Sequence, residues 1–288
     1  MIRLLVVSLL WAFSFGLIKT QLMGVDSSLV AAARLSLALL VFLPFLRIRS
    51  VAAGTAAPLL LIGAIQFGLM YLGYLKAFQT LAAYQVALLT IVTPIMVCLV
   101  DDALERRFRW QPLFAAALAV VGTGVIVVRQ PLGRAAWLGL LLVQVSNLCF
   151  ALGQVLYRRW KLARPHVHDR DVFAWLYLGA AAVTLPFAGT PSTMAIKLVA
   201  LAPVQGAVLI YLGFVASGLA FFLWNRGAQQ VSTASLAVMN NAKTPLGVAV
   251  SLLVFGEKTD LLRLLLGGAL VVAAAVYAQR IEPPPSRS

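Results

Sequence analysis

The chain returns repeatedly to apolar runs that are long enough to cross a lipid bilayer. A transmembrane helix needs about 20 mainly apolar residues. Ten such runs follow one another, at residues 2–18, 29–46, 57–79, 82–100, 112–128, 136–157, 172–188, 204–225, 233–255 and 262–279. Hydrophobic residues make up 62% of the chain and the mean hydropathy is +0.95, which is more apolar surface than a soluble domain of this length can bury. The sequence therefore predicts an all-α membrane protein with ten transmembrane helices, and its longest predicted loops are 158–171 and 189–203.

The ten runs divide into two halves that follow the same plan. Residues 30–45 (VAAARLSLALLVFLPF) and 172–187 (VFAWLYLGAAAVTLPF) have equal length and both end in Leu-Pro-Phe. A Thr-Pro pair at 93–94 answers another at 244–245. A unit of five helices crosses the membrane an odd number of times, so its copy must have the opposite orientation. Inverted repeats of this kind are typical of secondary transporters, whose substrate site lies near the midplane between the halves.

These landmarks predict a first five-helix repeat at 1–130 and a second at 131–281. The remaining segment, 282–288 (EPPPSRS), is rich in proline and is predicted to be a disordered tail. The loops between the runs are short, and the sequence contains no predicted soluble domain.

The net charge of +14 reports the orientation of the chain in the membrane. With a cytoplasmic N-terminus, the segments on the cytoplasmic side carry 14 Lys and Arg residues and the segments on the other side carry 6. Cytoplasmic loops of membrane proteins are enriched in Lys and Arg. The sequence therefore predicts a multi-pass protein of the cell (inner) membrane with both termini in the cytoplasm. Its partners are the lipid bilayer and a small molecule, and no nucleic-acid partner is expected.

The chain lacks the motifs of the common enzyme and metal sites. It contains no GxSxG, no HExxH and no Walker-type glycine loop. Cys98 and Cys149 lie inside predicted spans and indicate neither a disulfide framework nor a metal site. The sequence therefore predicts a protein that is not an enzyme, with no catalytic residues, no cofactor and no metal.

Apart from Arg3 and Arg263 at the very start of their runs, the cations inside the predicted spans are Arg34, Lys76 and Lys243. A charge at the centre of a transmembrane helix costs about 2.5–3.5 kcal/mol on insertion scales, so such residues usually face a cavity. Arg34 and Lys76 lie near the ends of their runs, where a long side chain can also extend to the membrane surface. Lys243 lies about 10 residues from either end of its run and is the strongest candidate for contact with a substrate.

Polar and aromatic residues surround these cations on several of the predicted helices. Asn240, Lys243 and Thr244 share one helical face, and Gln144, Asn147 and Gln154 form a second polar stripe. Buried amides can also join helices, and Trp or Tyr near a span end can mark the membrane interface. Their recurrence on several helices favours a polar cavity with aromatic walls. The predicted substrate-binding residues are Lys243, Asn240, Thr244, Asn147, Gln144, Trp11, Ser14, Tyr74, Trp224, Arg34 and Lys76.

Motifs along the whole chain carry a family resemblance. They include LLWAFSFGLIK at 9–19 and GLMYLGYLKAFQTLAAYQVALLTIVTP at 68–94, and the second half repeats the plan from 218 to 280. With these motifs the chain resembles the ten-helix, EamA-type branch of the drug/metabolite transporter superfamily. The resemblance implies two inverted repeats, alternating access, and a central cavity lined mainly by runs 1, 3, 4, 6, 8 and 9. It also implies that runs 5 and 10 are peripheral. The chain departs from the family pattern at Asp101-Asp102, where the family usually has an apolar span end.

The sequence thus predicts a secondary transporter that exports a small metabolite with an anionic or zwitterionic group, with an amino acid as the best fit. One alternative is an exporter of lipophilic cations or drugs. The scarcity of carboxylates inside the predicted spans disfavours it, since such ligands need a negative partner or an aromatic cage. The other alternative is a membrane sensor or scaffold that transports nothing, and the absence of a predicted output domain disfavours that. A monomer and a homodimer both fit the sequence.

Overall fold

The computed structural model describes residues 2–46, 53–127, 134–231, 246–247, 249–250, 252–256 and 260–281. Within these residues the chain is helical and contains no strand. Seven helical stretches are long and apolar enough to cross a membrane, namely Arg3–Gln21, Ser27–Phe45, Ala56–Ala77, Ala83–Leu104, Ala136–Leu162, Asp169–Ala188 and Pro203–Ala228. A shorter apolar helical stretch lies at Leu262–Ala274. This confirms the all-α membrane class, and most of the predicted ninth run, 233–255, lies outside the described residues.

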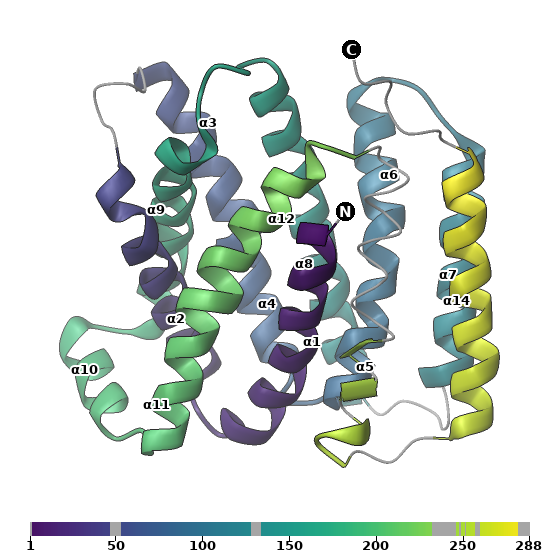
Figure 1. Ribbon diagram of the computed structural model, residues 1–288. Coiled ribbons are helices and arrows are strands. Elements are labelled where there is room, and N and C mark those ends of the chain that lie inside the picture. Colours follow the sequence, from purple (N-terminus) through teal and green to yellow (C-terminus); the bar gives the residue numbers. More distant parts are fainter. Residues whose placement is uncertain are drawn as a thin grey trace.

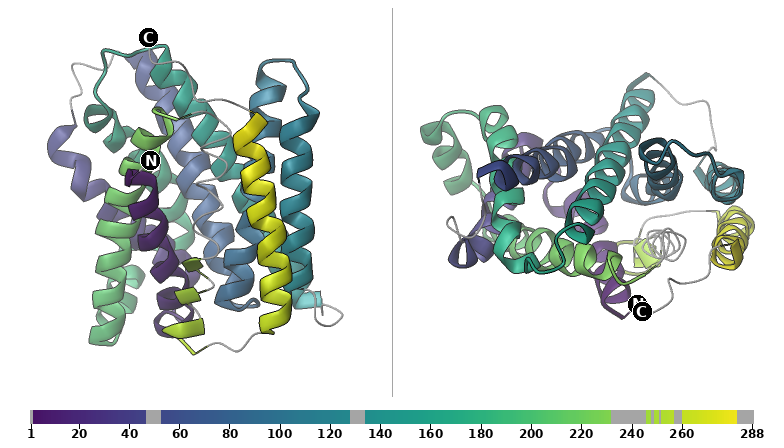
Figure 2. Two further views of the ribbon diagram at one scale, coloured as in Figure 1. Left: turned by 45° about the vertical axis from the view of Figure 1, so that its right-hand side comes forward. Right: turned by 90° about the horizontal axis from the view of Figure 1, so that it is seen from above.

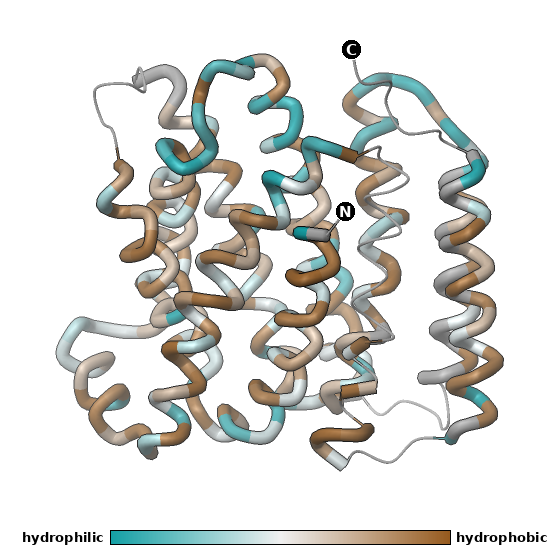
Figure 3. The backbone as a smooth tube through the Cα atoms, viewed as in Figure 1, coloured by the Kyte–Doolittle hydropathy of each residue, from teal (hydrophilic) through white to brown (hydrophobic). Residues whose placement is uncertain are grey.

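The helices stand side by side as a bundle, with hydrophilic residues gathered at its two ends (Figures 1 and 3). The first part of the chain contains α1 (Ile2–Gln21), α2 (Ser27–Phe42), η1 (Leu43–Phe45), α3 (Ala53–Gly63), η2 (Ala64–Leu69), α4 (Met70–Ala77), α5 (Ala83–Leu89), η3 (Thr90–Val92), α6 (Thr93–Leu104) and α7 (Trp110–Val127). The second part contains α8 (Arg134–Leu162), α9 (Asp169–Ala188), α10 (Pro191–Val199), α11 (Pro203–Ile210), η4 (Tyr211–Leu219), α12 (Ala220–Ala228) and α14 (Leu261–Ile281).

Helices α7 and α14 form a pair at one edge of the bundle. The view from above in Figure 2 sets them beside each other at the edge of the bundle. Phe114 of α7 and Tyr277 of α14 meet edge to face, with ring centroids 5.6 Å apart. These helices correspond to the fifth and tenth predicted runs, for which the family resemblance implies a peripheral place.

Three of the long helical stretches change their hydrogen-bond pattern in the middle. Between α3 and α4 the segment η2 is a π-helix, and between α11 and α12 the segment η4 is another. The stretch from Ala83 to Leu104 is interrupted by the 3₁₀ segment η3, which ends directly before Thr93. Pro94 has no backbone N–H, so the regular α-helical ladder cannot pass through it. Such irregular segments free backbone carbonyls for other partners and are frequent at functional sites.

Helices α3 and α9 approach each other at backbone distance through two glycines. A Cβ atom added to Gly179 would lie 1.9 Å from the carbonyl oxygen of Leu60, and one added to Gly63 would lie 1.8 Å from that of Leu176. Small residues at helix contacts let the backbones pack closely within a membrane. The glycines therefore fix α3, of the first part of the chain, against α9, of the second.

The structure changes one predicted boundary and one predicted loop. The sixth predicted run, 136–157, is longer in the structure, because α8 continues to Leu162. The stretch 189–203, predicted as a loop, contains the helix α10. The side chain of Thr190 accepts a hydrogen bond from the backbone N–H of Thr193, and Pro191 occupies the first turn, so both helix-start signals are present. The prediction of a loop was wrong because hydropathy gives little weight to a short, surface-exposed helix.

The two ends of the bundle differ in their charges. At one end, the carboxylates of Asp101, Asp102 and Glu105 pair with arginines. Arg109 lies 2.6 Å from Asp102, and Arg159 of α8 lies 2.8 Å from Asp101 and so ties α8 to α6. We call this the arginine-rich end, after Arg107, Arg109, Arg158 and Arg159. The opposite end carries Lys19, Lys76 and Lys197, and we call it the lysine end.

Candidate functional site

A small cavity lies in the middle of the bundle, between the two ends. Its volume is about 70 Å³, whereas sites for small-molecule ligands usually measure about 300–1,000 Å³. The bundle must therefore widen before a metabolite fits here, and this conformation is closed around the site. The cavity is lined by Trp11, Ser14, Phe15, Arg34, Met70, Tyr71, Tyr74, Thr90, Thr93, Ser146, Asn147, Phe150 and Phe221.

Arg34 is the charged group of this cavity. Its side chain is buried, with 2% of the residue exposed, so the alternative in which Arg34 extends to the membrane surface is wrong. Its Nε donates to the hydroxyl of Ser217 at 3.2 Å, and its Nη2 donates to the hydroxyl of Tyr71 at 2.8 Å. The guanidinium also lies 4.5 Å from the centre of the Tyr71 ring. These contacts hold the cation in a fixed place beside the cavity.

The hydrogen bonds leave part of the guanidinium free. Among the residues that the structure describes, the buried Nη1 of Arg34 has no hydrogen-bond partner. No carboxylate of the described chain forms an ion pair with Arg34 either. A buried cation without a counter-ion is costly, and inside a membrane such a residue usually has a functional partner. Arg34 is thus arranged to receive an anionic group that enters the cavity.

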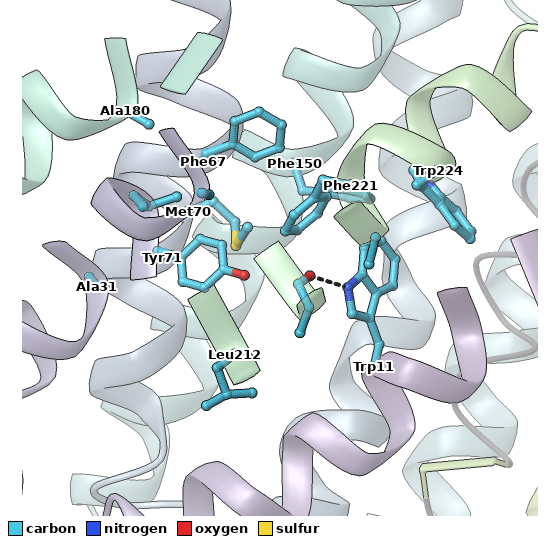
Figure 4. Close-up of a cluster of buried hydrophobic side chains, with 14 of the residues drawn as sticks. Trp11, Ala31, Phe67, Met70, Tyr71, Phe150, Ala180, Leu212, Phe221 and Trp224 are labelled. Atoms are coloured by element: carbon cyan, nitrogen blue, oxygen red, sulfur yellow. Dashed lines mark hydrogen bonds between the residues drawn. The ribbon is translucent and has the colours of Figure 1, made fainter. Parts of the chain in front are cut away.

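Aromatic rings close the cavity on the side of the arginine-rich end. We define the aromatic cluster as Trp11, Phe150, Phe221 and Trp224. The Trp11 ring lies 4.8 Å from Phe221, 5.0 Å from Trp224 and 6.3 Å from Phe150. Its indole N–H donates to the carbonyl oxygen of Ala216 in η4 at 2.9 Å (Figure 4). This bond uses a carbonyl of the π-helical segment and fixes the orientation of the Trp11 ring.

The part of the lining that α8 contributes contains an amide that binds the interrupted helix. Asn147 donates from Nδ2 to the carbonyl oxygen of Leu89 at 2.9 Å and to Oε1 of Gln144 at 3.3 Å. The Leu89 carbonyl lies at the last position of α5, where the backbone N–H of Thr93 instead donates to Thr90 in the 3₁₀ turn. The break ahead of Pro94 therefore leaves the Leu89 carbonyl available to α8.

The structure places the predicted site residues in three groups. Trp11, Ser14, Arg34, Tyr74 and Asn147 line the central cavity together. Other predicted residues lie elsewhere: Gln144 beside Asn147, Trp224 buried behind Trp11, and Lys76 exposed in a depression of about 1,070 Å³ at the lysine end. The predicted Lys243, Asn240 and Thr244 lie outside the described residues.

Several cavity residues were not among the predicted site residues. Phe150 follows Asn147 by one turn of α8 and Tyr71 precedes Tyr74 by one turn, so helical spacing from the predicted residues would have found these two; Ser146 is the direct neighbour of Asn147 and lies outside that spacing. Ser217 contacts Arg34 from within a π-helical segment. The usual spacing of 3.6 residues fails there, and no sequence signal marked it. The other unpredicted lining residues are Phe15, Met70, Thr90, Thr93 and Phe221.

Comparison with known proteins shows to which family this chain is similar. Residues 1–128 and 137–278 match the EamA-like transporter family. The chain belongs to this family. It is 40% identical over 98% of its length to a protein of Salmonella typhimurium named "Biotin transporter", of which it covers 94%. It is 39% identical to the "Biotin transporter" of Escherichia coli K12, over 97% of this chain and 93% of that one, and 41% identical to a "Probable biotin transporter" of Pseudomonas aeruginosa, over 94% of each.

A solved crystal structure has the same fold. It superimposes with a TM-score of 0.73 over 97% of this chain and 95% of that chain, at 19% sequence identity. Membership of the EamA-like family confirms a multi-pass membrane transporter for a small molecule and indicates that the protein is not an enzyme. The amino acid favoured by the sequence is not the molecule for which these relatives are named.

Proposed function

We propose that this protein transports biotin, or a closely related carboxylate that carries a cyclic urea, by alternating access. The observation that carries the proposal is the buried Arg34 beside the central cavity, whose Nη1 has no partner among the described residues. The names of relatives that align over almost the whole chain point to the same substrate.

The chemistry of the cavity fits such an acid. Biotin is a carboxylate on an apolar chain that ends in two fused rings with a urea and a thioether. Arg34 supplies a charge-assisted hydrogen bond to the carboxylate, and Trp11, Tyr71 and Phe221 supply apolar and aromatic surface for the rest. The described lining contains no carboxylate for a substrate ammonium. A simple acid therefore fits better than an amino acid, and a lipophilic cation fits worst.

The arrangement of the helices supports alternating access between two inverted halves. The π-helical segments η2 and η4 lie within Ala53–Ala77 and Pro203–Ala228, one in each proposed repeat. Each segment adjoins the region of the cavity, where an irregular turn provides a place for the helix to bend. The closed cavity then opens toward one end of the bundle at a time.

The proposed orientation follows from the excess of Lys and Arg in the predicted cytoplasmic segments, and it sets the arginine-rich end in the cytoplasm of a bacterial cell. Single cysteines at Arg170 and Ser192, both in described helices at opposite ends, test it. A membrane-impermeant thiol reagent added outside should label the cysteine at 192 and spare the one at 170. Labelling at 170 without labelling at 192 contradicts the proposed orientation, and labelling of both from outside contradicts their placement on opposite faces of the membrane.

The test of the substrate measures biotin flux in reconstituted proteoliposomes. Because the expected direction, export, is itself a prediction, uptake into vesicles and efflux from them are both measured. Arg34→Met removes the charge and keeps much of the bulk. We expect a loss of about 2–4 kcal/mol of binding, or roughly 30- to 1,000-fold in affinity. Arg34→Lys should restore only part of this, because an ammonium does not reproduce the planar fork.

Two controls separate charge recognition from general damage. Arg263→Met removes a positive charge from α14, in the peripheral pair, and should leave biotin flux near the wild-type value. Biotin methyl ester lacks the negative charge, so its binding should respond little to Arg34→Met. Equal loss of biotin and ester binding would show that Arg34 acts only through structure. A wild-type protein that moves no biotin in either direction would refute the proposed substrate.

A further inference from the structure

A second cavity lies between α6 and α8 at the arginine-rich end. Its volume is about 410 Å³, which is within the range of small-molecule sites. Asp101, Arg158 and Arg159 line its outer part, and Val97, Gln154 and Val155 line its inner part. It is distinct from the central cavity, since the two share no lining residue. Phe150 of the aromatic cluster lies one helical turn before Gln154 on α8.

Gln154 is the unusual residue of this second cavity. Only 1% of it is exposed, and neither Nε2 nor Oε1 has a hydrogen-bond partner within the described chain. Buried polar atoms are nearly always paired, and an unpaired one costs about 1–3 kcal/mol. A leucine at this position would avoid that cost. An amide with both its donor and its acceptor unused is arranged for a partner that is absent from the closed protein.

The neighbours of Gln154 keep it in this state. The nearby amide of Gln66 donates instead to Asn225 at 3.3 Å. Gly153 lets the backbone of α8 approach Gln66 so closely that a Cβ atom there would lie 2.2 Å from the Cβ of Gln66. Arg159 is engaged by Asp101 at 2.8 Å and by Glu105 at 2.9 Å. The Nε2 of Gln66 and the Nη2 of Arg159 thus have other partners, whereas the buried Oε1 of Gln66 is itself unpaired among the described residues.

The unused atoms define the chemistry of the ligand. A ligand group matches both atoms of the amide at once when it presents an N–H and a C=O side by side, as a cyclic urea or a primary amide does. A carboxylate satisfies only the donor and sets its negative charge against Oε1. We propose that the cavity between α6 and α8 is a second substrate site, in which Gln154 binds a urea or amide group.

The proposal rests on the proposed function, because a substrate with both a carboxylate and a urea uses both cavities. Gln144, Asn147 and Gln154 belong to one polar stripe of α8, which runs from the central cavity to this one. Phe150 interrupts the stripe. A substrate that passes the aromatic cluster would meet Gln154 one turn later, before it reaches the arginines and water.

The experiment compares wild type with Gln154→Leu, using 2-imidazolidone as a cyclic urea without a carboxylate and hexanoate as a carboxylate without a urea. Affinities come from the thermal stabilisation of purified protein across millimolar ligand concentrations. We expect the variant to bind 2-imidazolidone about tenfold or more weakly, from the loss of two hydrogen bonds, and to bind hexanoate as wild type does. Gln111→Leu, the same change on the peripheral α7, should alter neither affinity.

The melting temperature without ligand is the second measurement. Removal of an unpaired buried amide should leave it unchanged or raise it. A fall would show that Gln154 joins helices, and would overturn the proposal, as would unchanged binding of 2-imidazolidone. If wild type binds 2-imidazolidone through Gln154 but moves no biotin, the site stands and the proposed substrate fails. If biotin flux depends on Arg34 while Gln154→Leu binds biotin and 2-imidazolidone as wild type does, the proposed function stands and this site fails.

Discussion

Gly179→Ala should destabilise the protein, although the same change usually stabilises a helix. The added Cβ would lie 1.9 Å from the carbonyl oxygen of Leu60, and ordinary contact begins at 3.4 Å, so α3 and α9 would have to separate by about 1.5 Å. Overpacking of this kind costs about 1–3 kcal/mol or more. The better helix propensity of alanine returns at most about 1 kcal/mol. Because backbone atoms clash on both sides, no rotamer change relieves the contact.

Thermal unfolding of purified variants in detergent tests this value. A net loss of about 2 kcal/mol corresponds to a melting temperature roughly 4–8 °C lower. The matched control is Gly268→Ala in α14, where an added Cβ would meet nothing within 4 Å. That variant should melt at or slightly above the wild-type temperature. If Gly179→Ala melts as high as Gly268→Ala, the two helices are not in backbone contact and the reasoning fails.

Three further predictions concern the cavity, the lysine end and the ninth run. Asn147→Ala should reduce transport per folded molecule because it removes the hydrogen bond to the Leu89 carbonyl, and Trp11→Ala should do so because it opens the aromatic cluster. Flux at the wild-type rate in both variants would show that these side chains serve only packing. Burial raises the pKa of Asp26, but the hydrogen bonds from Lys197 and from the backbone lower it by a larger amount. The net effect is a pKa below the ordinary value of 3.8. Asp26→Asn should therefore cost up to about 1 kcal/mol at pH 7, and melting curves should show the difference fading below pH 3.8. Lys243→Met should weaken substrate binding in flux assays while folding survives, and unchanged affinity would rule Lys243 out as an anion site.

The sequence predicted the helical class and the position of most spans, because bilayer-length hydropathy is a strong signal. It also predicted Trp11, Asn147 and Arg34 as cavity residues, since polar and charged side chains inside a span have few structural uses. It could not predict which helical face looks inward at η4, where the turn is wider than usual and carries Ser217 to Arg34.

Two further features depend on tertiary packing that no local pattern encodes. The sequence ranked Lys243 above Arg34 by distance from the helix ends. The structure shows that a position near a helix start can still be buried, because neighbouring helices cover it. The unpaired donor and acceptor of Gln154 could not be predicted either, since a sequence shows an amide but not whether its atoms have hydrogen-bond partners.

The hydrogen bonds of Arg34 connect parts of the chain that lie far apart in sequence. Its guanidinium, on α2, is bound to Tyr71 of α4 and to Ser217 of η4, and those two hydroxyls lie 2.9 Å from each other. If a carboxylate displaces either hydroxyl, ligand binding weakens a contact that joins the two proposed halves. Part of the binding free energy then goes into loosening this contact between the halves and does not contribute to substrate affinity. A carrier built in this way holds its cargo only moderately, and for that reason it can release it.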